Sequence, residues 1–175
     1  MNDAMTKERL LTTLANERAR WESLLGEVGE ARMMEPGVAG FWSMKDLLAH
    51  LTAYQRTWGA RIRGEVTGVP PTPRDLYDVE LLPEGVGTWT LDEQNEAIRA
   101  QYDPLPLPVA LAKWRETSDL LAAGVTDLSE ADLTTPGRFV WAGDRPLAEA
   151  MAGDTYGHAQ LHAADVRAWL DRAGA

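Results

Sequence analysis

The chain contains no cysteine among its 175 residues. This absence excludes disulfide bonds, thiolate metal ligands and a cysteine nucleophile. No run of the sequence approaches the roughly 20 apolar residues that a helix needs to cross a bilayer. The first residues, MNDAMTKERLL, also lack the basic segment, apolar core and cleavage site of a secretory signal. Together these absences predict a cytoplasmic protein that does not interact with membranes.

Basic side chains are scarce. The 17 lysines and arginines are outnumbered by 27 aspartates and glutamates, which gives a formal net charge of −10. Such a chain is repelled by phosphate backbones, and no cluster of lysine or arginine offers a local exception. We therefore expect that neither nucleic acid nor an anionic membrane is a partner, and that the acidity serves solubility.

The length suits one domain with its own core, and we expect a single domain over residues 1–175. Proline and glycine gather in five places, at 35–40, 64–73, 83–87, 103–108 and 135–146. Between these breaks the apolar residues recur with helical periodicity, and we find no internal repeat.

Four long helical segments are predicted, which makes the fold class all-α. The first covers about 6–28, and the second runs from Ser43 to about 63, with Ser43 and Asp46 spaced as in a capping box. The third covers 91–101 and, after a proline break, either resumes or begins anew at 109–123. The fourth runs without interruption from about 146 to 172. A short helical turn at 127–133 and a brief extended piece at 138–143 complete the prediction: a four-helix bundle with a long connection between helices 2 and 3.

The chain has only three histidines, and two of them, His158 and His162, lie four residues apart in HAQLH. On a helix this spacing places both imidazoles on one side, where they can share one metal ion. The glutamate of the zinc-protease motif is absent between them, so peptidase chemistry is not supported. The stripe that this segment would turn inward has apolar residues at both ends and polar ones in its middle: Leu147, Met151, Asp154, His158, Leu161, His162, Asp165 and Trp169.

The third histidine, His50, lies near the middle of the second segment, on the flank of its apolar stripe. In a four-helix bundle the second and fourth helices can face each other across the core, which would bring His50 to the pair. The pattern leaves two interpretations open. The three histidines either bind one divalent ion or are ordinary core and boundary residues satisfied by hydrogen bonds.

This arrangement resembles the DinB/YfiT-like superfamily of four-helix metal-binding proteins, whose members carry one histidine on the second helix and a His-x-x-x-His pair on the fourth. The matching residues are His50 in WSMKDLLAHL, and His158 and His162 in DTYGHAQLH. The resemblance covers nearly the whole chain. In TWTLDEQNEAIRAQY and DTYGHAQLHAADVRAW it is similar to the ClbS/DfsB-like branch, here with an intact histidine triad. It implies a metal held by the three histidines and, in many members, a homodimer.

Three histidine ligands leave a coordination position open for water or substrate, as in catalytic sites. Imidazole suits zinc and nickel equally well, so the metal is expected to be one of these. The predicted function is that of a metal-dependent enzyme acting on a small electrophilic molecule. The metal-bearing relatives imply thiol-dependent transfer or isomerisation with a low-molecular-weight thiol, whereas the ClbS-like features imply hydrolysis. The alternative is a protein that binds or sequesters a small molecule, with a structural or vestigial metal.

Three polar residues near the histidines are candidates for a supporting role. Tyr54 lies one turn beyond His50 and either orients a ligand or packs in the core. Asp154 precedes His158 by four residues and Asp165 follows His162 by three. Each aspartate either orients an imidazole or binds the metal, or else forms an ordinary ion pair on the helix surface.

Four further residues are candidates for the lining of a pocket. Trp21, Trp58 and Trp89 either form the walls of an apolar pocket or pack as core aromatics. Asn95 matches a recurring asparagine of the branch that the chain resembles.

Overall fold

The computed structural model describes residues 5–173, and within these residues the chain is helical, without any strand. The four longest helices are α1 (Lys7–Val28), α2 (Met44–Thr67), α5 (Leu107–Asp127) and α8 (Tyr156–Ala173). The shorter ones are α3 (Pro73–Tyr77), α4 (Leu91–Tyr102), α6 (Glu130–Thr134) and α7 (Leu147–Ala150). Single 3-10 turns lie at Glu30–Arg32, Val86–Thr88, Val140–Ala142 and Ala152–Asp154.

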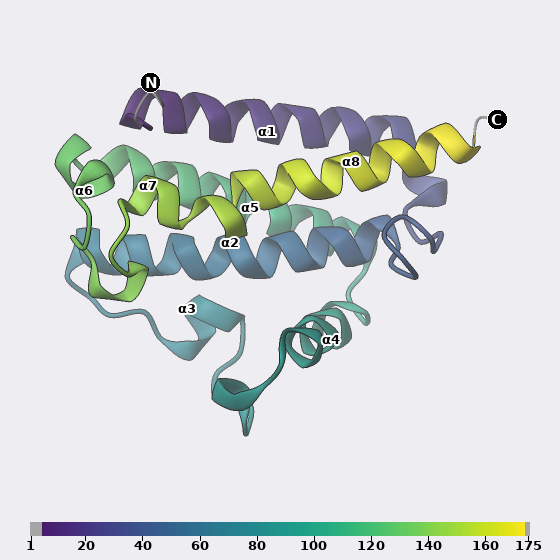
Figure 1. The fold of residues 1–175 in the computed structure, drawn as a ribbon. Coiled ribbons are helices and arrows are strands. Elements are labelled where there is room, and N and C mark those ends of the chain that lie inside the picture. The colour runs from purple at the N-terminus through teal and green to yellow at the C-terminus, as the bar shows by residue number, and fades with distance from the viewer. Residues whose placement is uncertain (1–4, 174–175) are drawn as a thin grey trace.

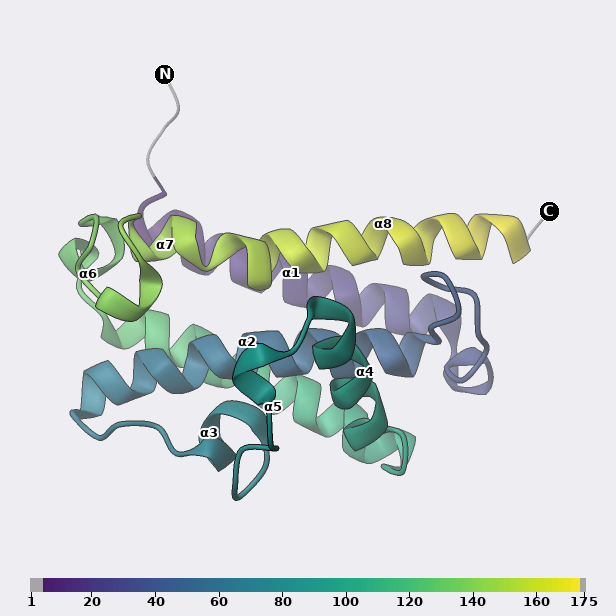
Figure 2. The ribbon, with the colours of Figure 1, turned by 60° about the horizontal axis from the view of Figure 1, so that its bottom comes forward.

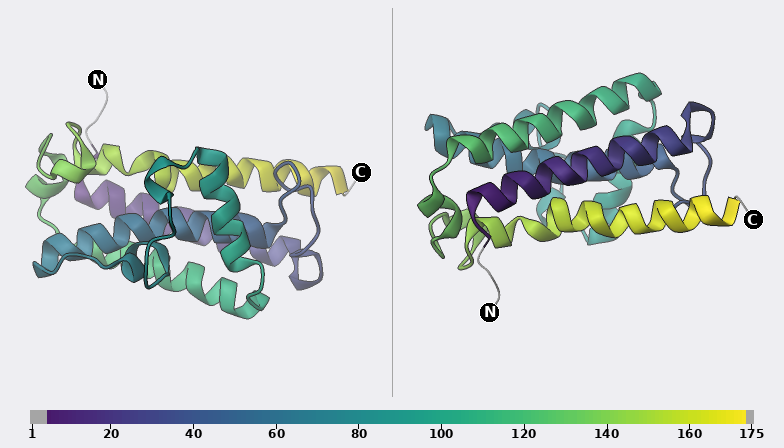
Figure 3. Two further views of the ribbon diagram at one scale, coloured as in Figure 1. Left: turned by 90° about the horizontal axis from the view of Figure 1, so that it is seen from below. Right: turned by 90° about the horizontal axis from the view of Figure 1, so that it is seen from above.

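The four long helices form a bundle in which α1 contacts α5 and α8, and α2 contacts the same two helices (Figures 1 and 3). The connection from α2 to α5 spans residues 68–106 and carries α3 and α4, which lie on the outer side of α2 (Figure 2). The prediction of an all-α four-helix bundle with a long connection between helices 2 and 3 is therefore confirmed. Among residues 5–173, no helix combines the length and the apolar composition required to cross a bilayer.

Two apolar clusters fill the bundle. One surrounds Trp21, Leu48 and Trp114, and the other surrounds Leu10 and Ile62. All five side chains are at most 2% exposed. Since both clusters combine residues from α1 and α2 with residues from later helices, they hold the bundle helices in fixed positions relative to one another.

The beginning of α2 is determined by a capping box, as its sequence predicts. The Ser43 hydroxyl accepts a hydrogen bond from the Asp46 backbone N–H at 3.2 Å, and the Asp46 carboxylate accepts one from the Ser43 N–H at 2.8 Å. Two N–H groups that would otherwise lack partners at the helix start are thereby satisfied. This cap fixes the register of α2, and with it the position of His50.

The predicted third helix is in fact two helices. After α4 the chain turns through residues 103–106, and α5 begins after Pro106. Only α5 belongs to the bundle. Trp114 and Leu121 turn inward on it and join the core.

The predicted fourth helix is interrupted, which corrects the expectation of one continuous helix over 146–172. After α7 the chain forms a 3-10 turn and then passes through Thr155, whose φ of −124° and ψ of −106° are not helical. The Thr155 hydroxyl donates to the carbonyl of Met151 at 2.7 Å, which stabilises the break. A Cβ at Gly157 would lie 2.8 Å from the carbonyl oxygen of Ala152, so glycine permits this close approach.

Two smaller expectations are also wrong. Leu161 is 63% exposed instead of facing inward. The buried face of α8 is centred on Ala159, Ala163 and Val166, so the histidines lie at its edge and Leu161 lies beyond that edge. The segment 138–143 contains the 3-10 turn Val140–Ala142 rather than an extended piece.

Candidate metal centre

Three imidazoles from two helices meet at one point of the bundle. The Nε2 atom of His50, on α2, lies 2.9 Å from Nε2 of His158, which lies 3.2 Å from Nε2 of His162. One ligand atom from each of the three residues falls within 4.8 Å of the other two. His50 is 5% exposed and the two histidines of α8 are half-buried. The structure therefore brings together all three histidines of the chain.

The spacing of these nitrogens fits a common metal ligand set. Two imidazole nitrogens bound at 2.0–2.1 Å to a tetrahedral ion lie about 3.3–3.4 Å apart. The observed separations of 2.9 and 3.2 Å are close to this value. Small side-chain rotations about χ angles would be enough to admit an ion at the point where the three rings converge.

The protonation states of His50 and His158 also fit a metal site. Burial, reinforced by the two neighbouring imidazoles, lowers the pKa of His50 from 6.5 to about 3. Burial likewise lowers the pKa of His158, with a further contribution from His162. Both rings are therefore neutral near pH 7. A neutral imidazole offers the lone pair that a metal requires, so no proton has to be removed from these two ligands.

Asp165 contacts the third ring. Its carboxylate oxygen lies 3.0 Å from Nδ1 of His162, one turn along α8. A carboxylate can only accept this hydrogen bond, so Nδ1 carries the proton and the Nε2 lone pair points to the other two histidines. Carboxylate, histidine and metal are arranged in this order in many metal sites.

The other two imidazoles lack such partners within the described residues. Nδ1 of His50 and Nδ1 of His158 are buried without a hydrogen bond of normal geometry there, although the Asn95 side chain and the Asp154 backbone lie near enough to raise the pKa of His50 and of His158 respectively. Buried polar atoms without a partner cost folding free energy. A metal at Nε2 would leave both Nδ1 atoms as they are, so the fit of the donor set to a metal rests on the spacing of the Nε2 atoms and on the neutral rings.

Tyr54 and Asp154 lie beside the triad. The Tyr54 ring centre is 4.8 Å from that of His50 and 5.1 Å from that of His158, and its hydroxyl donates to the side-chain oxygen of Asn95 at 3.2 Å. Burial raises the pKa of Tyr54, and the negative charge of Asp154 raises it further. The same charge opposes the fall in the His158 pKa.

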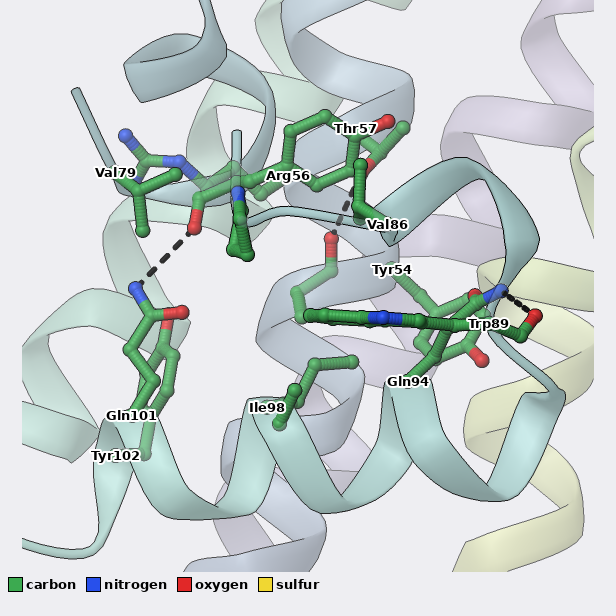
Figure 4. Close-up of a pocket in the computed structure, with 14 residues that line it drawn as sticks. Tyr54, Arg56, Thr57, Val79, Val86, Trp89, Gln94, Ile98, Gln101 and Tyr102 are labelled. Atoms are coloured by element: carbon green, nitrogen blue, oxygen red, sulfur yellow. Dashed lines mark hydrogen bonds between the residues drawn. The ribbon is translucent and has the colours of Figure 1, made fainter. Parts of the chain in front are cut away.

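The three candidate tryptophans lie in different places. Trp21 is part of the core, and its indole N–H donates to the carbonyl of Ala159 at 3.1 Å. Trp58 donates to the Asp154 carboxylate at 3.0 Å, and through it supports the surroundings of His158. Trp89 lines a cavity between α2 and α4 (Figure 4). Asn95 accepts a hydrogen bond from Tyr54 and also lies beside His50, whose pKa its side chain raises.

Sequence reasoning missed Trp42, whose ring centre is 4.9 Å from that of His50 in an edge-on contact. The residue lies in the irregular segment before α2, where no periodicity indicates its direction. Its position next to the Ser43 cap was the available signal, because that cap brings the preceding chain back over the first turns of α2.

The fold and this cluster define a class of protein: an all-α bundle with a candidate three-histidine metal site. A family model described as the DinB superfamily matches residues 13–166. The chain belongs to the DinB superfamily.

Solved structures share this fold over nearly their whole length. DfsB, described as a sibling lethal factor precursor, has a TM-score of 0.76 and 16% identity, covering 97% of this chain and 98% of its own. A protein from Streptococcus pneumoniae has a TM-score of 0.75 and 15% identity, covering 97% and 92%. The colibactin self-resistance protein ClbS has a TM-score of 0.72 and 14% identity, covering 94% and 95%. A comparison with curated protein sequences finds no match.

One of these structures corrects the expectation about nucleic acid. ClbS was crystallised in complex with double-stranded DNA. The exclusion of nucleic acid as a partner, which rested on the net charge of −10, is therefore wrong. Net charge averages over the whole surface, whereas contact with a nucleic acid depends on the local distribution of charge and shape.

Proposed function

We propose that the protein is a metal-dependent enzyme that acts on a small electrophilic molecule. The proposed ligands of the ion, zinc or nickel, are His50, His158 and His162. The convergence of the three Nε2 atoms carries this proposal, because it provides three ligands and leaves further coordination positions for water or substrate. The catalytic alternatives are hydrolysis and thiol-dependent transfer or isomerisation.

When bound, a divalent ion acts as a Lewis acid that lowers the pKa of a water or thiol nucleophile. The residues of the chain have separate tasks. Asp165 holds the ring of His162 through the contact of 3.0 Å. Trp42 and Tyr54 pack against His50 and help to exclude water from it. The Tyr54 hydroxyl, held by Asn95, is the neutral polar group placed to orient a substrate beside the triad.

The thiol for the transfer reaction must come from outside, because the chain has no cysteine. A low-molecular-weight thiol is therefore the proposed co-substrate in that reaction. Hydrolysis needs only water. Hydrolysis and thiol transfer would use the same site. They are distinguished by whether turnover requires the added thiol.

Metal content tests the ligands. We expect about one equivalent of zinc or nickel in protein purified without a histidine tag. The His158→Ala and His162→Ala double variant should lose it, whereas Gln160→Ala, an exposed position on the same helix, should keep it. Stoichiometric metal that persists in the double variant would show that these residues are not the ligands.

Turnover tests the reaction. An activated aryl chloride and a nitrophenyl ester, each supplied with and without glutathione, separate thiol transfer from hydrolysis. His50→Ala should abolish turnover while circular dichroism shows that the helices remain. A protein that binds one equivalent of such a compound and releases no product would instead support the sequestering alternative, in which the metal is structural or vestigial.

Three broader proposals accompany this function. The chain is proposed to form one domain over residues 1–175, to assemble as a homodimer and to act in the cytoplasm. The homodimer rests on the family resemblance. Light scattering coupled to size exclusion tests it, and a mass of about 19 kDa in solution would contradict it.

A further inference from the structure

A cavity of about 300 Å³ lies between α2 and the connection that carries α3 and α4 (Figure 4). Its walls are mainly apolar and include Val86, Trp89, Ala97 and Ile98. The indole of Trp89 is seen edge-on in Figure 4, with Ile98 beside the face that is turned to α4, so the flat ring forms part of the wall. Binding sites for small molecules are concave and mainly apolar, with a few well-placed polar groups.

One of the polar groups of this cavity has no partner. Tyr102, at the end of α4, is 3% exposed, and its hydroxyl makes no hydrogen bond within the described residues. Hydroxyls of buried tyrosines usually find a partner. Tyr102 lines the cavity, and a ligand atom that reached this covered hydroxyl would satisfy it.

The charge at the cavity is already neutralised. Arg56 is the one charged residue among those that line it. The guanidinium of Arg56 donates to the carbonyl oxygens of Asp75 and Arg74, both at 2.9 Å, and lies 3.5 Å from the Asp78 carboxylate. No lining side chain is therefore free to pair with a charged ligand, and burying an unpaired charge is costly.

Tyr54 links the cavity to the histidines. It lines the cavity, and its ring packs on His50 and His158. Its partner Asn95 and the residue Tyr102 are seven positions apart on α4, which corresponds to about 10 Å along the helix. The cavity therefore runs from Tyr54, which separates it from the triad, to Tyr102 at the end of α4.

We propose that this cavity binds an uncharged, flat apolar group of the substrate, with a hydrogen-bonding atom at the Tyr102 end, while the reactive end of the molecule reaches past Tyr54 to the histidines. That the bound molecule is a substrate rests on the proposed function. The binding of an uncharged apolar group stands without it. In this role Tyr54 is a positioning residue that forms the border between the two parts of the site.

Titration calorimetry with 2-naphthol as the probe tests the cavity. The wild type should bind it, and 2-naphthoate, which has the same ring system but a negative charge, should bind at least tenfold more weakly. Ala97→Trp places a large side chain in the cavity and should weaken 2-naphthol binding at least tenfold. Ala100→Trp is the matched control, because Ala100 is exposed on the same helix. The affinity of this variant for 2-naphthol should stay within twofold of the wild type.

Tyr102→Phe tests the hydroxyl. It should weaken 2-naphthol binding about two- to tenfold, the range expected for one hydrogen bond. Binding of 2-methylnaphthalene, which cannot make that bond, should be unchanged. If Ala97→Trp does not fold, Ala97→Leu provides a smaller obstruction that should still weaken binding more than Ala100→Leu does.

The results separate this inference from the proposed function. Binding of 2-naphthol by the His158→Ala and His162→Ala double variant at wild-type affinity supports a cavity that is independent of the metal. A wild type that binds 2-naphthol but takes up neither zinc nor nickel would contradict the proposed function and leave this inference standing. Absence of binding to the wild type, equal affinities of Ala97→Trp and Ala100→Trp, or equal affinities for 2-naphthol and 2-naphthoate would each overturn the inference.

Discussion

Removal of the Asp165 carboxylate is expected to weaken metal binding without removing a ligand. The carboxylate lies 3.0 Å from Nδ1 of His162 and holds the ring with its other nitrogen towards the triad. Loss of such a partner typically costs 10–100-fold in metal affinity. The Asp165 side chain is 42% exposed, so water screens its charge and takes over part of its hydrogen bonding. We therefore expect the lower end of that range for Asp165→Ala, about tenfold in the dissociation constant.

The dissociation constant for zinc can be measured at pH 7 by competition with a chromophoric chelator. Asp165→Asn keeps an oxygen that accepts the hydrogen bond but loses the charge, so its affinity should fall by less than that of Asp165→Ala. Asp171→Asn is the matched control, because Asp171 is exposed on the same helix and the net charge changes equally. Its affinity should stay within twofold of the wild type. Equal affinities of Asp165→Ala and Asp171→Asn would refute the role of this contact.

Three other predictions concern the stability of the metal-free protein, measured by urea denaturation with a chelator present. Folding lowers the pKa of His50 from 6.5 to about 3, so the folded chain binds fewer protons there than the unfolded one, and stability should fall as the pH drops. The loss between pH 6.5 and 5 should be about 1.5–2 kcal/mol; an unchanged pH dependence in His50→Gln would contradict this. Gly124→Ala should destabilise by about 1–2 kcal/mol, because its Cβ would lie 2.8 Å from Cγ2 of the buried Ile62; Gly26→Ala, which meets no atom within 4 Å, should instead stabilise by about 0.5–1 kcal/mol. Ser43→Ala should cost about 1 kcal/mol through loss of the cap of α2, and a cost near zero would show that the cap does not matter.

Local signals in the sequence predicted much of the bundle. The periodicity of 6–28 agrees with α1 to within one residue, and the spacing of Ser43 and Asp46 predicted the beginning of α2. Both signals depend on residues that are neighbours along the chain. The meeting of three histidines, by contrast, depends on how α2 and α8 pack, and the family resemblance rather than the pattern favoured it. Metal binding there stays a prediction.

The break before α8 could not be predicted from periodicity. Residues 147–172 keep a helical pattern through the interruption, since it is short, a 3-10 turn followed by Thr155, and the Thr155 side chain satisfies the local carbonyl. His158 and His162 lie on the same side of the break, so their spacing was unaffected. The cavity could not be predicted from the sequence either, because Tyr102 and Trp89 lie in a connection whose packing against α2 is set by tertiary contacts.

The central claim is that one divalent ion binds to three imidazoles, and X-ray absorption spectroscopy of the zinc-loaded protein tests it most directly. The account predicts three histidine nitrogens at about 2.0–2.1 Å, with the outer-shell scattering of imidazole rings. Loss of that outer-shell scattering in the His158→Ala and His162→Ala double variant would complete the assignment. A spectrum fitted by oxygen ligands alone, or one that stays the same in the double variant, would contradict the claim.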